Sequence, residues 1–157
     1  MILYASKFGT VRDFVHLVPD TTAYDVSDRK SPVRRVLADA PNEPVFIVAS
    51  IYAGKLNGAM RKFLEQERAL FETRPVACGI GCLAEDQEAQ DYLASAYPPW
   101  LIARAELSVV VGGRVRFATL PVFMRFFMKK ILGSGEDVDR LQTDRAAEIH
   151  AWLTRAR

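Results

Sequence analysis

Four short apolar runs constrain what this chain can fold into more than any other feature of its sequence. They span residues 2–5, 45–49, 76–80 and 107–111, and turn-forming residues bound them. The apolar residues are continuous instead of alternating with polar ones, which is typical of strands buried on both faces of a parallel sheet. A weaker run at residues 23–26 predicts one further strand nearer the sheet edge. The sequence therefore predicts a buried parallel sheet at the centre of the fold.

Segments with helical spacing separate these strands. They span residues 11–17, 31–39, 58–70, 85–97 and 143–153. Strands that alternate with helices are joined by right-handed crossovers, which place helices on both faces of an open sheet. The expected fold class is therefore α/β, with a doubly wound parallel sheet, and 157 residues suit a single domain.

The charge balance and the cysteines argue against several classes of function. A formal net charge of +2 is too small a basic excess to predict nucleic-acid binding. Cys78 and Cys82 are the only cysteines, and both histidines are far from them in sequence, so the spacing does not predict a metal site. The sequence also identifies no catalytic side chain, because His16 and His150 have no recognisable nucleophile around them.

The chain begins directly with an apolar run, without the basic segment and cleavage site of a signal peptide. None of its apolar runs approaches the ~20 residues of a membrane-spanning helix. We therefore expect a cytoplasmic protein, with peripheral contact at the inner face of the membrane as the alternative that a later segment raises.

In an open α/β sheet, ligands bind outside the carboxyl ends of the strands. The segment after the first run, which opens a helix, is Ser6, Lys7, Phe8, Gly9, Thr10 and Val11. Backbone amides at a helix start favour a phosphate, Gly9 allows close approach, and Ser6 and Thr10 offer hydroxyl groups. A capped helix start with no ligand explains the same residues about as often.

Two more segments follow strands at the same edge. The first, after residues 45–49, is Ser50, Ile51, Tyr52, Ala53, Gly54 and Lys55. The second, around the end of the next run, contributes Gly79, Gly81 and Cys82. An aromatic ring with glycines suits a planar heterocycle, although tight turns also use such residues. Because the three segments meet at one sheet edge, we predict that they form one binding site.

The sequence also resembles a known family. Residues 4–10 and 50–56 resemble the flavodoxin-domain family that includes the menaquinone-dependent protoporphyrinogen oxidases. Residues 112–117, 123–131 and 133–137 resemble an insert of that family at about residues 112–139. The resemblance covers nearly the whole chain. It implies a five-stranded flavodoxin-like fold that binds FMN and, for an oxidase, electron transfer from a porphyrinogen substrate through the flavin to a quinone or another redox partner.

By the same resemblance, residues 6–11 would hold the phosphate, and residues 50–55 and 79–82 would frame the isoalloxazine ring. Phe8 and Val11 stand where hydroxyl side chains are usual in the family's phosphate loop, so Lys7 or Arg12 would have to compensate by charge. Two alternatives therefore stay open: an FMN electron carrier without a substrate of its own, and a flavodoxin-fold interaction domain that has lost the flavin.

A basic and apolar segment at residues 120–132 carries Arg125, Lys129 and Lys130 among phenylalanines and methionines. As a helix it either lies on an anionic membrane surface or packs its apolar side on the domain with its cations in water. Arg114 and Arg116, which precede it, suit the carboxylates of a porphyrinogen or a solvated strand end.

Overall fold

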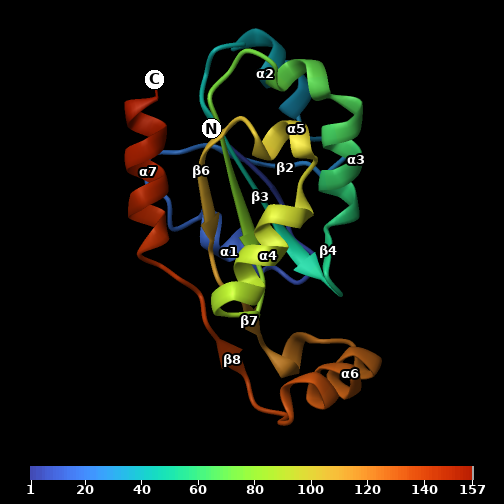
Figure 1. Cartoon of the computed structure of the whole chain (residues 1–157). Helices are drawn as coiled ribbons and strands as arrows, with labels where there is room; N and C mark the ends of the chain where they lie inside the picture. Colours follow the sequence, from blue (N-terminus) through green and yellow to red (C-terminus); the bar gives the residue numbers. More distant parts are fainter. Residues whose placement is uncertain (157) are drawn as a thin grey trace.

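The computed structural model describes residues 1–156, and a parallel sheet forms its centre (Figure 1). The parallel strands are β1 (Ile2–Ala5), β2 (Ala23–Asp25), β3 (Val45–Tyr52), β5 (Val76–Gly81) and β6 (Ala105–Val110). They lie in the order β2-β1-β3-β5-β6. The chain runs outward from β1 to β2 and then back past β1 to β3, so the strand order reverses between β1 and β3. The predicted α/β fold with five parallel strands is confirmed.

Helices cover both faces of the sheet. One face packs against α2 (Val33–Asp39), α3 (Gly58–Gln66), α4 (Asp86–Ala96) and α5 (Pro99–Ile102), and the other packs against α1 (Thr10–Val15) and α7 (Arg145–Arg155). Successive strand side chains point to opposite faces, so Leu3 and Ile47 enter the first core while Ile2 and Phe46 enter the second. Each central strand must therefore be apolar at every position, which explains the continuous runs in the sequence.

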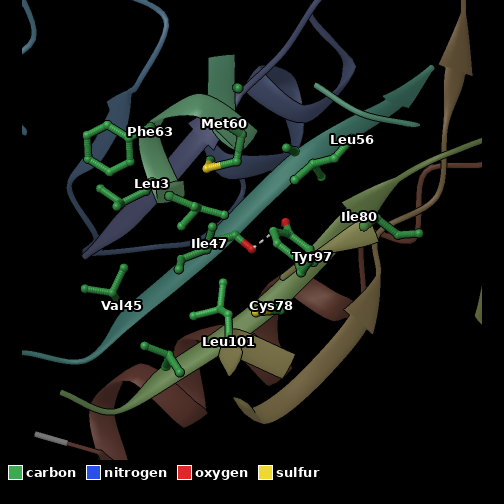
Figure 2. Packing of buried hydrophobic residues seen from close by; sticks show 14 of the residues in the cluster. Leu3, Val45, Ile47, Leu56, Met60, Phe63, Cys78, Ile80, Tyr97 and Leu101 are labelled. Atoms are coloured by element: carbon green, nitrogen blue, oxygen red, sulfur yellow. Dashed lines mark hydrogen bonds between the residues drawn. The ribbon is translucent and has the colours of Figure 1, made fainter. Parts of the chain in front are cut away.

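Figure 2 shows the first core, where a single polar group joins two central strands. The hydroxyl of Tyr97 lies 2.6 Å from the carbonyl oxygen of Gly79 on β5 and 3.2 Å from that of Ile47 on β3, and it donates to them. Burial raises the pKa of Tyr97 well above its usual value. The phenol therefore stays protonated and remains a donor to both strands.

The structure differs from the prediction after the third strand. β3 continues to Tyr52, and Ala53 and Gly54, with φ values of 48° and 72°, turn the chain into β4 (Lys55–Leu56), which pairs antiparallel with β3. The predicted loop at residues 50–55 is therefore a hairpin. Ser50 ends the apolar run in the sequence, which is why the pattern ends the strand too early.

The predicted helices are all present with ends shifted by a few residues, and two helical segments differ more clearly from the prediction. The helix expected over residues 58–70 ends at Gln66, and a 3-10 helix, Arg68–Phe71, follows it. The helix α5 was not predicted, because its four residues are too few to show a helical periodicity.

The segment at about 112–139 leaves the main sheet and returns to it. Its ends pair as the antiparallel strands β7 (Arg114–Val115) and β8 (Val138–Asp139), and between them lie a 3-10 helix, Phe117–Thr119, and α6 (Val122–Leu132). α6 projects beyond the carboxyl end of the sheet (Figure 1). Within residues 1–156, no helix combines the length and the apolar character needed to cross a bilayer.

Arg74 forms hydrogen bonds with three backbone segments at the other end of the sheet, where the strands begin. Its side chain is 1% exposed and donates to three carbonyl oxygens, those of Leu70 (2.5 Å), Leu37 (2.7 Å) and Glu43 (3.4 Å). The Leu37 carbonyl lies in the last turn of α2, where no amide within the helix can reach it. Arg74 thus satisfies backbone groups that would otherwise be buried without donors.

We expect the substitution Arg74→Met to lower the free energy of unfolding by about 2–4 kcal/mol, because it leaves buried carbonyl groups unpaired. Urea unfolding followed by circular dichroism measures this loss. Arg35→Met is the control, since the Arg35 side chain is 86% exposed, and we expect it to change stability by less than about 0.5 kcal/mol. Equal losses for the two variants would contradict this role of Arg74.

Candidate functional site

A row of small residues crosses the carboxyl ends of three neighbouring strands. Ala5 of β1 pairs with Ala49 of β3, so Ser6 and Ser50 each lie one position beyond that pair, and Ser50 pairs with Gly81 of β5. By alternation, all three positions of the row face the side of the sheet that α1 covers. The row therefore leaves space between the sheet edge and the start of α1.

A cavity of about 290 Å³ occupies this space. Its lining includes residues from all three predicted segments, namely Ser6, Phe8, Thr10, Ser50, Ile51, Tyr52, Gly81 and Cys82. This volume is near the lower end of the ~300–1,000 Å³ that is typical of ligand sites. The structure thus brings the three segments together around one cavity.

The hydroxyl groups of Ser6 and Ser50 distinguish this cavity from an ordinary surface hollow. Both oxygen atoms are buried, and neither has a hydrogen-bond partner within the described chain, residues 1–156. A buried hydroxyl without a partner costs about 1–3 kcal/mol. Because both serines line the cavity, a polar ligand there would supply the partners that the protein does not.

The first turn of α1 adds backbone donors to the same cavity. Gly9 precedes α1 in the left-handed conformation, with a φ of 87°, and no side chain caps the helix there. The first amides of a helix have no acceptor within it, so those of this turn can bind an anion. A Cβ atom built on Gly9 would lie 3.1 Å from a terminal nitrogen of Arg12, so a cation flanks this turn.

An aromatic pair borders the other side of the loop at residues 6–10. Phe8 and Tyr52 meet edge to face, with 6.1 Å between their ring centroids, and the Lys7 ammonium lies 4.0 Å from the Tyr52 ring centroid. The Tyr52 hydroxyl donates to the sulfur of Met124 on α6 at 3.2 Å. Tyr52 therefore contacts both the loop and α6 at the cavity wall.

The segment at 112–139 also closes around the cavity. Thr10 donates its hydroxyl proton to the carbonyl oxygen of Arg114 at 2.9 Å, and the Arg114 guanidinium pairs with Asp139 (2.9 Å) and Asp13 (3.4 Å). Burial would raise the pKa of Asp139, but hydrogen bonds from the Leu141 amide and from Arg114 lower it overall. Asp139 therefore stays ionised at neutral pH and keeps β8 fastened to α1 through Arg114.

Several lining residues lie outside the predicted set. α1 contributes Arg12 and Asp13, the turn after β5 contributes Leu83, and the segment around β7 and α6 contributes Gly113, Arg114, Val115, Arg116, Thr119, Leu120 and Met128. The last group is about a hundred residues from the loop at 6–10 in sequence. No local spacing connects two segments so far apart. The signals in the sequence were the basic character of Arg114 and Arg116 and the resemblance of residues 112–117 to the family's insert.

Other predicted residues do not reach the cavity. Lys7 lies over the Tyr52 ring, while Ala53, Gly54 and Lys55 form the hairpin tip beyond it. Val11 is fully buried in the second core, where a Cβ atom on Gly81 would come within 2.6 Å of its methyl group. Gly79 lies inside β5, and a Cβ atom there would lie 2.5 Å from the Phe46 ring. These two glycines leave room for side chains packed against the sheet.

The two cysteines differ in position. Cys82 lines the cavity and Cys78 lies in the first core, where burial raises the pKa of its thiol to about 12. Burial also raises the pKa of Cys82. Both are therefore thiols at neutral pH. Residues 1–156 contain no group of three or more histidine, cysteine or acidic side chains that could hold a metal ion.

We expect Ser50→Ala to leave the stability of the ligand-free protein unchanged or to raise it by up to about 1 kcal/mol, because it removes an unpaired buried hydroxyl. Thr10→Val is the matched control, since it removes a hydroxyl from the same cavity that is hydrogen-bonded, and should cost about 1 kcal/mol. Urea unfolding compares the two variants. A loss of 1 kcal/mol or more for Ser50→Ala would mean that its hydroxyl has a partner within the protein.

Comparison with known proteins places this arrangement in a family. A family profile described as "Flavodoxin domain" matches residues 1–141. The fold is also similar to that of rubredoxin oxygen:oxidoreductase from the anaerobe Desulfovibrio gigas, with a TM-score of 0.51 and 11% sequence identity over 99% of this chain and 36% of that one. A search of curated proteins finds no significant match. Because the profile covers most of its length, the chain belongs to the flavodoxin domain family.

Proposed function

We propose that this protein binds FMN in the cavity at the carboxyl edge of its sheet and works as an oxidoreductase. The observation that carries the proposal is the pair of buried, unpaired hydroxyls of Ser6 and Ser50 in that cavity. Flavodoxin domains typically bind FMN, and flavin binding at the carboxyl ends of β1 and β3 is general for this strand order. The family and the unpaired polar atoms thus support the same ligand at the same place.

The phosphate of FMN fits the loop at residues 6–10. Ser6 supplies a hydroxyl, the first turn of α1 supplies backbone amides, and Arg12 supplies a positive charge beside Gly9. The Thr10 hydroxyl already donates to the carbonyl oxygen of Arg114, so it can donate to the phosphate only after its side chain rotates. The side chains of Phe8 and Val11 cannot form hydrogen bonds with the phosphate. The charge of Arg12 replaces part of the stabilisation that hydroxyl side chains at these positions provide elsewhere in the family.

The ring system fits the other side of the cavity. Ser50, Ile51 and Tyr52 line it from β3, and Gly81 and Cys82 line it from β5. Tyr52 offers an aromatic face, and the Ser50 hydroxyl is free to bond a polar ring atom. Bound FMN would supply the redox chemistry, and these residues would orient its ring and limit its contact with water.

The basic lining supports a more specific proposal, a protoporphyrinogen oxidase that passes electrons to a quinone. Arg116 lines the cavity, is exposed, and has no ion-pair partner among the described residues. Its guanidinium can pair with a substrate carboxylate, such as a porphyrinogen propionate. Arg114 is less suited to this role because Asp13 and Asp139 already pair with it.

FMN titration of the purified protein, followed by flavin fluorescence, tests the proposal. We expect saturable binding with a dissociation constant near ~1 μM, and binding of riboflavin about tenfold or more weaker because riboflavin has no phosphate. Ser50→Ala should weaken FMN binding by about three- to tenfold while leaving the fold intact. The absence of saturable binding at high micromolar FMN would leave a flavodoxin-fold interaction domain.

Gly9→Ala and Gly133→Ala form a matched pair for the phosphate loop. Both glycines have positive φ values, 87° and 71°, so alanine strains the backbone in the same way at the two positions. The added Cβ atom would also lie 3.1 Å from the Arg12 guanidinium at Gly9, whereas it would meet nothing within 4 Å at Gly133, which lies at the end of α6. We expect the Gly9 variant to weaken FMN binding by about tenfold and the Gly133 variant to change it by less than about twofold. Equal weakening would argue against a phosphate at residues 6–10.

Anaerobic turnover of protoporphyrinogen IX with a menaquinone analogue tests the more specific proposal on the FMN-loaded protein. We expect quinone reduction, with Arg116→Ala raising KM for the porphyrinogen by about tenfold or more and leaving FMN affinity unchanged. Bound, reducible FMN without turnover would instead indicate an electron carrier.

A further inference from the structure

α6 exposes most of the large apolar side chains that the described surface presents. On this helix Val122 is 80% exposed, Phe126 is 79% exposed and Phe123 is 72% exposed, and Phe127 and Ile131 are also exposed. Elsewhere in residues 1–156, only Phe8 and Leu17 are exposed large hydrophobic residues. So dense a group on an eleven-residue helix is unusual for a surface that meets only water.

The helix α6 contacts the rest of the domain through a narrow stripe of buried apolar side chains. Met124, which is 2% exposed, packs with Leu120 and Val115, and Met128 packs against the same cluster one turn later. At 100° per residue the exposed apolar positions occupy about half of the helix circumference, in an arc that begins at Ile131, next to Met124, and extends away from it to Val122. The domain therefore fixes the position of α6 through one side and leaves the wider apolar side to another partner.

The charges that α6 itself carries are all positive. Its eleven residues include Arg125, Lys129 and Lys130 and no aspartate or glutamate, and the next acidic residues, Glu136 and Asp137, come after its C-terminus. Lys129 and Lys130 are exposed in the last turns of α6, three and four positions after Phe126 and therefore next to it on the helix surface. Arg125 folds back to donate to the carbonyl oxygens of Leu120 and Ala118, which holds the start of the helix in place. The partner of this face should therefore be both apolar and anionic.

We propose that α6 docks on the surface of an anionic lipid bilayer, with its outer phenylalanines among the acyl chains and its lysines at the headgroups. A bilayer accommodates an apolar side of this width, whereas a helix seated in a protein groove usually presents a narrower stripe. Lys130 lies within the apolar arc, and its long side chain reaches headgroups while its methylenes stay in the apolar layer. Acidic lipids supply the negative charge that this face does not contain.

Docking through α6 would bring the cavity to the membrane surface. Met128 of α6 lines the cavity, as does Leu120 just before the helix, while Phe123 and Phe126 are exposed on α6. Because α6 projects beyond the carboxyl end of the sheet (Figure 1), the helices on the sheet faces do not block its approach to a bilayer. A lipophilic redox partner dissolved in the membrane would then lie next to the cavity. The docking itself does not require the proposed flavin.

Vesicle co-sedimentation of the full chain, without added FMN, tests the proposal. We expect binding to vesicles of equal parts phosphatidylcholine and phosphatidylglycerol, weaker binding at high salt, and at least about tenfold weaker binding to phosphatidylcholine alone. The double substitution Phe123→Ser, Phe126→Ser should reduce binding about tenfold or more, and Leu17→Ser, at an exposed apolar residue elsewhere, should not change it.

A second pair of variants tests the charges. Lys129→Glu with Lys130→Glu should remove most of the preference for anionic vesicles, whereas Arg61→Glu with Lys62→Glu, on exposed positions of α3, should leave it nearly unchanged. Circular dichroism confirms that each variant is folded. Failure to bind anionic vesicles, or equal losses in the control pair, would overturn the proposal. So would a dimer in solution that the phenylalanine substitutions dissociate, since a second copy would then cover this face.

Discussion

The in-register pairing of β1, β3 and β5 is the constraint on which the candidate site depends. It places Ser6 beside Ser50 and pairs Ser50 with Gly81, so two hydroxyls and a glycine lie side by side at the sheet edge. Side chains alternate between faces, so a slip of one residue would turn these positions toward the other core. The continuous apolar runs that fill both cores prevent such a slip, and the core thus positions the polar edge.

The segment that carries α6 is part of the site instead of an appendage to it. Arg114 joins β7 to α1 and β8 through Asp13 and Asp139, Thr10 bonds the Arg114 carbonyl, and Tyr52 bonds Met124. The helix that presents an apolar side to its surroundings is therefore tied to the cavity wall by direct contacts. A change in the contacts of α6 can therefore affect the ligand site through these same residues.

The sequence was sufficient for the parallel strands, the two helical layers and most of one cavity wall, because these follow from local periodicity and from the rule that ligands bind at the carboxyl edge. It was not sufficient for the hairpin at Ala53 and Gly54, where turn geometry extends a strand past its apolar run. It also did not show that Val11 belongs to the core under Gly81, or that residues 113–128 close the cavity. Those features arise from tertiary contacts between segments far apart in the chain.

A crystal structure of the protein with FMN is the most direct test of flavin binding at the carboxyl edge of the sheet. We expect the phosphate at residues 6–10, the ring beside Tyr52, and hydrogen bonds from the hydroxyls of Ser6 and Ser50 to the ligand. FMN bound at another surface, or at this edge with both hydroxyls still unpaired, would show that these hydroxyls do not mark the flavin site.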